Sequence, residues 1–103
     1  MPRGVPVQVK AFGIYGFENL EDPRFSGYDV KPTMLFCGDD ETAKLIVAEL
    51  IAACGFEPFD VGGLAQALHL EHMTLLWVRM VRAEGHSPHL VWSALRRPKP
   101  GSA

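Results

Sequence analysis

Residues 33–61, TMLFCGDDETAKLIVAELIAACGFEPFDV, contain the pattern that decides the fold. Their first five residues are a continuous apolar run without alternation, which is typical of a strand covered on both faces, as in a parallel sheet. A helix is expected from about Asp40 to Cys54. Asp39 and Asp40 can accept hydrogen bonds from its first backbone N–H groups, and Gly55 can end it.

A third, short strand is predicted at Phe56–Val61. Pro58 cannot donate a hydrogen bond to a neighbouring strand, so this strand is expected to lie at the edge of the sheet or to pair irregularly. Strand, helix and strand within about thirty residues make one crossover unit with two parallel strands. On a helical wheel the expected inner face of its helix contains Thr42, Ala43, Ile46, Val47, Leu50, Ala53 and Cys54, and the outer face Glu41, Lys44, Ala48, Glu49 and Ala52.

On either side of this unit the chain contains further elements. Alternating apolar residues predict a first strand at Val5–Ala11, followed by a glycine- and proline-containing loop over residues 13–32. A long apolar helix is expected at Leu64–Arg82, and Ser87 before Pro88 predicts a short last helix at Pro88–Arg97. The prediction is one α/β domain over residues 1–97 with a flexible tail, 98–103. It has a small, three-stranded, partly parallel sheet with one crossover helix, the long apolar helix and the short C-terminal helix.

The long helix is apolar almost all round. Its main apolar arc contains Ala67, Leu70, Met73, Trp77, Val78, Met80 and Val81, yet leucines also lie on the opposite side. Such a helix must bury a second surface, against a loop, another helix or another chain. A symmetric homodimer is the commonest solution. The candidate dimer interface consists of Leu68, His72, Leu75, Leu76 and Trp77.

Composition excludes several classes of function. The chain has 103 residues, 48% of them apolar, and 10 Lys and Arg against 12 Asp and Glu give a net charge of −2. A nucleic-acid surface needs many gathered cations, and the basic cluster in this chain, Arg96–Lys99, is small. No apolar run is long enough to span a membrane, and the first residues lack the apolar core of a signal peptide. We expect a cytoplasmic protein with no nucleic-acid or membrane partner.

The two cysteines, Cys37 and Cys54, lie in apolar segments and are predicted to be reduced core thiols. A buried Cys37 would have a raised pKa and would be unreactive. Asp39–Glu41 is interpreted as helix capping. Histidines spaced for shared metal binding occur twice, at positions 69 and 72 and at positions 86 and 89, but without a neighbouring acidic or cysteine ligand we expect no metal.

The common catalytic and nucleotide-binding motifs are absent from the sequence. Gly13–Gly16 lacks the third glycine and the following helix of a phosphate-binding turn. Glu71 lies among leucines and a methionine on the long helix, where an ionised carboxylate must find a donor or remain near solvent. It is interpreted as a buried, hydrogen-bonded structural residue, with a binding role as the alternative.

Several segments, in the same order and spacing, resemble the C-terminal part of the NADP oxidoreductases that use a deazaflavin coenzyme and of related predicted dinucleotide-binding proteins. These segments are Val9–Gly13, Gly16–Pro23, Met34–Asp40, Gly55–Leu64 and Leu70–Glu71. The resemblance implies a substrate-side domain that completes the sheet, helps to form the pocket for the hydride partner and dimerises. The N-terminal Rossmann unit that binds NADP in this family is not represented, so no cofactor is expected with this chain alone.

The resemblance places a candidate pocket at Phe12, Gly13, Phe17 and Glu71. The family has Asn and Thr after its Lys-Ala-Phe run, where this chain has Gly13 and Ile14. The first functional hypothesis is therefore a stand-alone, non-catalytic module that self-associates through the long helix. The alternatives are one half of a split NADP-dependent oxidoreductase, completed by a separate Rossmann protein, and a small-ligand-binding module. No catalytic residue is assigned.

Overall fold

The computed structural model describes residues 7–13, 24–25 and 27–97 of the chain. The predicted tail, Phe17 and most of the long loop lie outside the described residues. The elements, in chain order, are β1 (Val9–Lys10), β2 (Thr33–Gly38), α2 (Glu41–Ala53), β3 (Glu57–Asp60), the 3-10 helix η1 (Leu64–Gln66) and α3 (Ala67–Arg82).

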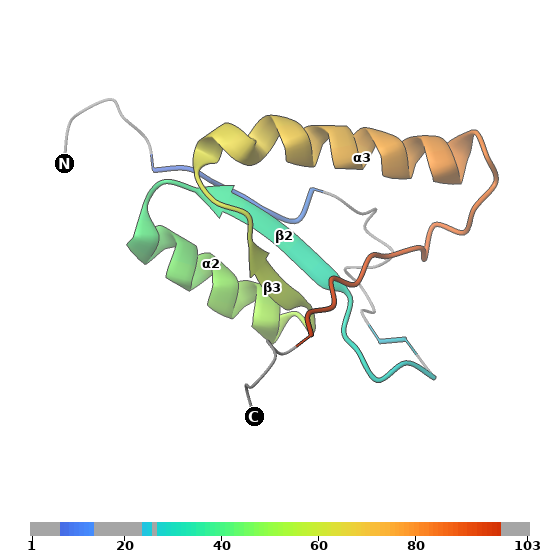
Figure 1. Cartoon of the computed structure of the whole chain (residues 1–103), viewed down its shortest axis with the longest axis horizontal. Helices are drawn as coiled ribbons and strands as arrows, with labels where there is room; N and C mark the ends of the chain where they lie inside the picture. Colours follow the sequence, from blue (N-terminus) through green and yellow to red (C-terminus); the bar gives the residue numbers. More distant parts are fainter. Residues whose placement is uncertain (1–6, 14–23, 26, 98–103) are drawn as a thin grey trace.

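The three strands form one sheet in the order β1-β2-β3, so β2 is central and β3 is an edge strand. β2 and β3 are parallel, with Thr33 paired to Glu57, and β1 is antiparallel to β2, with Lys10 paired to Cys37. α2 and α3 lie on opposite sides of the sheet (Figure 1). The predicted strand–helix–strand unit and the edge position of the proline-containing strand are both confirmed.

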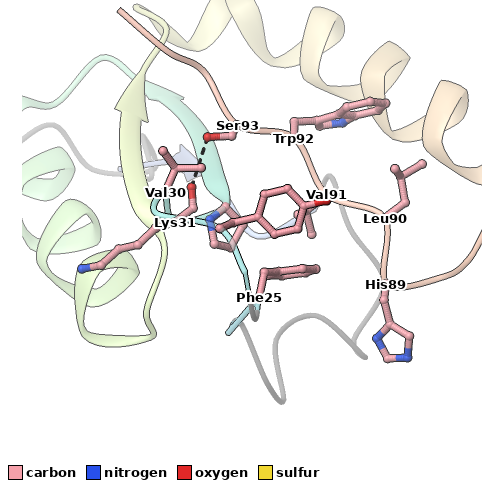
Figure 2. A pocket seen from close by; sticks show the side chains of 10 residues that line it. Phe25, Val30, Lys31, His89, Leu90, Val91, Trp92 and Ser93 are labelled. Carbon is pink, nitrogen blue, oxygen red and sulfur yellow. Dashed lines mark hydrogen bonds between the residues drawn. The ribbon is translucent and has the colours of Figure 1, made fainter.

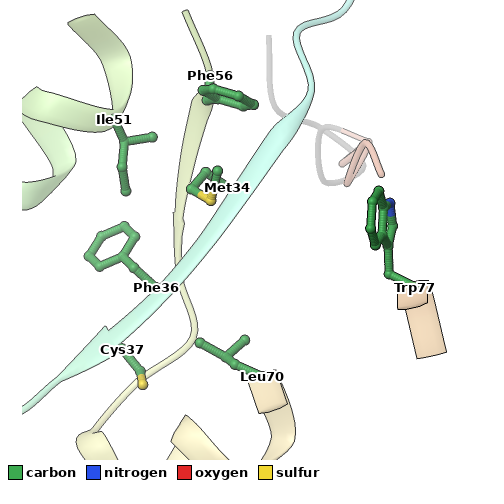
Figure 3. Close-up of a cluster of buried hydrophobic side chains, with 7 residues drawn as sticks. All are labelled: Met34, Phe36, Cys37, Ile51, Phe56, Leu70 and Trp77. Carbon is green, nitrogen blue, oxygen red and sulfur yellow. The ribbon is translucent and has the colours of Figure 1, made fainter. Parts of the chain in front are cut away.

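The core is built around β2, whose side chains alternate between the two helices. Met34 and Phe36 lie on the side of Ile51 from α2, and Cys37 lies on the side of Leu70 from α3 (Figure 3). All five of these side chains are buried. The central strand is thus covered on both faces, which explains the uninterrupted apolar run in its sequence.

The inner face of α2 differs from the expected one. Lys44 and Ile51 are buried, whereas Leu45, Ile46 and Leu50 are 67%, 63% and 53% exposed. We call these last three residues the α2 outer patch. Apolar residues occur on both sides of this helix, so the periodicity alone does not determine which side faces the sheet. The buried position predicted for Cys54 is also wrong, because this residue is exposed at the C-cap of α2.

The predicted C-terminal helix does not form. The chain makes a turn at Ser87–Leu90 and then runs without helix to residue 97, back toward the start of β2 (Figure 1). The backbone N–H of Thr33 donates to the Trp92 carbonyl at 2.8 Å, and the Ala94 N–H donates to the Thr33 hydroxyl oxygen at 2.8 Å. These long-range bonds replace the intrahelical bonds that the segment would otherwise make. We call residues 90–97 the C-terminal strap.

The elements on either side of the strand–helix–strand unit agree in part with the sequence-based prediction. The long helix is confirmed as η1 followed by α3, and its main apolar arc faces the core, with Leu70 and Trp77 buried. Val5 lies outside the described residues; among those described, Val9–Lys10 pairs with β2, whereas Val7 and Ala11 of the predicted first strand lie outside the ladder. No helix in the described part of the chain is long and apolar enough to cross a membrane.

Candidate functional site

The structure brings three of the four candidate pocket residues close to one another, near the carboxyl end of β2. The Lys10 Nζ lies 2.6 Å from Glu71 Oε1, which ties β1 to α3. The Thr74 hydroxyl, one turn along α3, donates to the Gly13 carbonyl at 2.7 Å. Phe12 lies between the two tied points in sequence. We call Lys10, Phe12, Gly13, Glu71 and Thr74 the β1–α3 site.

Lys10 is the member of this site that the sequence analysis missed. Paired residues of neighbouring strands point to the same side of a sheet, and Lys10 is paired with Cys37, which faces α3. The ammonium group therefore lies beneath the first turns of that helix, next to Glu71. The alternation of side chains along the first strand could have indicated this residue, because it places Lys10 on the opposite face of the strand from Val9 and Ala11.

The environment of Glu71 is not the buried one that was expected. Its side chain is 57% exposed, and its ion pair with Lys10 is open to solvent. Such an exposed pair contributes little to stability. More than half of the Glu71 side chain therefore stays in contact with water.

The backbone turns sharply where β1 ends at this site. Phe12 has a φ of +61°, which bulky residues rarely adopt. The turn carries the carbonyl of Gly13 to the Thr74 hydroxyl, which also lies 3.0 Å from the Leu70 carbonyl. Backbone strain of this kind occurs at ligand-binding positions more often than elsewhere. The β1–α3 site thus offers a carboxylate, an ammonium group and a fixed carbonyl at one edge of the sheet.

A second polar cluster lies at the carboxyl ends of β2 and β3. Lys44, buried on α2, places its Nζ 2.8 Å from Asp60 Oδ2 and donates to the Gly62 carbonyl at 3.2 Å. The other carboxylate oxygen of Asp60 accepts from the Gly62 N–H at 2.8 Å. These contacts hold α2, β3 and the turn after β3 in one arrangement, so the cluster is structural.

The pKa values of this pair shift in the directions that an ion pair requires. The hydrogen bond to Asp60 raises the pKa of Lys44, although burial opposes this change. Burial alone would raise the pKa of Asp60, but hydrogen bonds from Lys44 and from the Gly62 N–H lower it. Both groups are therefore held charged, and neither is poised to exchange a proton near neutral pH.

The acidic residues after β2 cap helices, as predicted from the sequence. Asp40 is the N-cap of α2 and accepts from the Ala43 N–H at 2.8 Å. Asp39 instead accepts from the Leu64 N–H at 2.9 Å, at the start of η1. A Cβ on Gly63 would approach Asp39 Oδ1 to 2.7 Å, so the carboxylate fits only because this residue is glycine.

Cys37 is buried, as predicted, and burial raises the pKa of its thiol. This environment disfavours the reactive thiolate. Within the described residues, no three His, Cys, Asp or Glu side chains are placed to hold a metal ion.

The second apolar surface of α3 is open to solvent. Leu68, Leu75 and Leu76 are 60%, 60% and 55% exposed, and His72 between them is exposed as well. We call these four residues the α3 outer patch. Trp77, the fifth residue of the candidate interface, does not belong to it. Its indole is buried and donates to the Leu90 carbonyl at 2.7 Å, which anchors the C-terminal strap.

Comparison with known proteins shows sequence similarity to a curated protein. No protein-family model matches it. The chain is 40% identical over 68 residues to metalloreductase STEAP3 of Rattus norvegicus. The chain is related to part of an oxidoreductase. The matched stretch is 65% of this chain but spans 13% of the length of that protein, so the activity of the whole relative does not transfer with it.

Proposed function

We propose that this chain is an oxidoreductase-related module, similar to the substrate-side domain of the deazaflavin-dependent NADP oxidoreductases. It is non-catalytic on its own and pairs with a second copy through the α3 outer patch. The observation that carries the proposal is the exposure of three leucines on one side of α3, while the other side of the same helix packs in the core.

The outer side of α3 is suited to pairing with itself across a two-fold axis. At about 100° per residue, Leu68, Leu75 and Arg79 lie within one narrow stripe along the helix. With the axis beside Leu75 and two antiparallel helices, the leucines of the two copies meet at the centre, as a closed, isologous interface requires.

The absence of catalysis by the chain alone is inferred from how its polar groups are used. Lys44, Asp60 and Asp39 hold backbone groups and one another. The Cys37 thiol is buried with a raised pKa. Of the groups discussed above, the exposed Lys10–Glu71 pair is the one placed to meet a ligand.

Sedimentation equilibrium of the full chain tests the proposal. We expect a monomer–dimer equilibrium that Leu75→Asp abolishes, because burying an unpaired carboxylate at the centre of the interface is costly. Leu45→Asp is the matched control, since Leu45 is at least as exposed as Leu75 but belongs to α2, on the opposite side of the sheet. A monomer at all concentrations, or equal loss of dimer in both variants, would overturn the proposal.

A second candidate function is one half of a split oxidoreductase, in which a separate Rossmann protein supplies NADP. It is favoured by the position of the Lys10–Glu71 pair at the carboxyl end of β2, because α/β sheets bind ligands at such ends. The test adds NADPH, a deazaflavin and the product of a neighbouring reading frame to this chain. We expect hydride transfer that Glu71→Gln slows, and its absence with such a partner counts against this candidate.

A further inference from the structure

A pocket lies at the opposite end of β2 from the β1–α3 site. It has a volume of about 250 Å³ and is formed between the segment that precedes β2 and the C-terminal strap (Figure 2). We propose that this pocket binds a planar, two-ring aromatic anion. The pocket shares no residue with the β1–α3 site or with either outer patch.

The walls of the pocket are flat and apolar. Phe25, Tyr28 and Pro32 come from the segment before β2, and Val91 and Trp92 come from the strap. Tyr28 is exposed, so its side of the pocket is reached from solvent. Aromatic and proline rings on one side, with a tryptophan on the other, favour a planar apolar ligand, because ring systems gain from stacked or edge-on contact with aromatic side chains.

The volume selects the size of the ligand. An apolar cavity of about 150 Å³ takes up a single benzene ring. The pocket here is about 250 Å³, which admits a second fused ring but little more. A naphthalene or indole skeleton therefore fits this volume.

The charge around the pocket selects an anion. Lys31 and His89 are among the ten lining residues, and none of the ten is an aspartate or a glutamate. Both side chains extend away from the apolar centre in Figure 2. The Lys31 ammonium group is the cation among these lining residues, so a ring buried between the walls would turn its carboxylate toward Lys31.

The pocket is held in shape before any ligand enters. The Ser93 hydroxyl donates to the Lys31 carbonyl at 3.3 Å and directly joins the two walls. The Thr33 N–H fixes the Trp92 carbonyl at 2.8 Å, and the Trp77 indole fixes the Leu90 carbonyl at 2.7 Å. The strap is thus pinned on both sides of Val91. A preformed site loses less conformational entropy when a ligand binds.

The proposal is tested by titrating the ¹⁵N-labelled full chain with 2-naphthoate and following amide chemical shifts. We expect saturable shifts confined to residues 25, 27–32 and 89–93. The cation 2-naphthylmethylammonium, which has the same rings, should bind about threefold more weakly or worse, since the Lys31 ammonium group repels it. Shifts that do not saturate, shifts centred elsewhere, or equal affinity for the cation would overturn the proposal.

Two variants locate the site. Tyr28→Ala removes an exposed aromatic wall without disturbing the core, and we expect it to weaken 2-naphthoate binding by about three- to tenfold. Val91→Trp fills the pocket and should abolish binding while amide dispersion is retained. Leu95→Ala is the matched control, because Leu95 is an exposed strap residue outside the pocket, and its affinity should stay within about twofold of the parent. Unchanged binding by the folded Tyr28→Ala variant would contradict the assignment.

Discussion

Two isoleucines on the same helix are predicted to differ strongly in how much they contribute to the free energy of unfolding. Ile51 is 0% exposed and packs between α2 and the sheet, whereas Ile46, in the α2 outer patch, is 63% exposed. Replacing each with alanine removes the same atoms from the same helix. The difference between the two variants therefore measures which side of α2 faces the core.

The magnitudes follow from burial. Ile51→Ala removes about three carbon groups at about 0.8 kcal/mol each, and the cavity left behind adds to this loss. The better helix propensity of alanine returns about 0.4 kcal/mol, so the net loss in the free energy of unfolding is about 3 kcal/mol. For Ile46→Ala about a third of the transfer term applies, and the net loss is about 0.5 kcal/mol.

Urea unfolding followed by far-UV circular dichroism measures both values. With an m-value of about 1.5 kcal/mol/M, Ile51→Ala should lower the midpoint by about 2 M and Ile46→Ala by about 0.3 M. The measurement is made at low protein concentration, so that association does not contribute. Equal losses, or a larger loss for Ile46→Ala, would refute the orientation of α2 described above.

The remaining predictions concern the polar contacts around β3 and η1. The lowered pKa of Asp60 means that its stabilising contribution is present above its ordinary pKa of 3.8 and is lost as the pH falls through the folded value. The raised pKa of Lys44 means that its contribution is present below 10.5 and is lost as the pH rises through the folded value. Asp60→Asn should flatten both arms of a plot of unfolding free energy against pH, and unchanged arms would contradict this. Gly63→Ala should lower the free energy of unfolding, measured in urea, by about 1–2 kcal/mol, because the new Cβ displaces the Asp39 carboxylate from the Leu64 N–H. An unchanged free energy of unfolding would show that this hydrogen bond contributes nothing.

The elements that local chemistry specifies were predictable. β2 is an apolar run bounded by a capping aspartate, and the structure has Asp40 at the N-cap of α2 as the sequence predicts. The parallel pairing of β2 and β3 follows from the length of the connection between them. α3 is predictable because its core-facing arc is continuous and contains both of its buried residues, Leu70 and Trp77.

The orientation of α2 was not predictable, because it depends on a long-range pair. A lysine on a wheel is placed outside by default, yet Lys44 is buried against Asp60, sixteen positions later. The two meet only when the helix lies on the parallel strands. Pairing these charges also turns Ile51 inward and the α2 outer patch outward.

The C-terminal strap illustrates the same limit. Ser87 and Pro88 are a correct signal for a turn but not for a helix, since nothing local predicts that Thr33 will bond to both Trp92 and Ala94. The residues of the β1–α3 site also divide into those that the sequence indicated and one that only the structure shows. Phe12, Gly13 and Glu71 were found through resemblance, whereas Lys10 requires knowing that β1 runs antiparallel beside Cys37.

The α2 and α3 outer patches lie on opposite sides of the sheet and so point away from each other. A subunit that can associate through both patches can bind two other subunits. If only the α3 outer patch pairs with the same patch of a second copy, assembly stops at two subunits. If the α2 outer patch also pairs in this way, each added subunit exposes another patch and the product is a linear polymer. Whether assembly stops at two subunits is therefore decided at the exposed residues of α2, on the side of the sheet that faces away from the dimer contact.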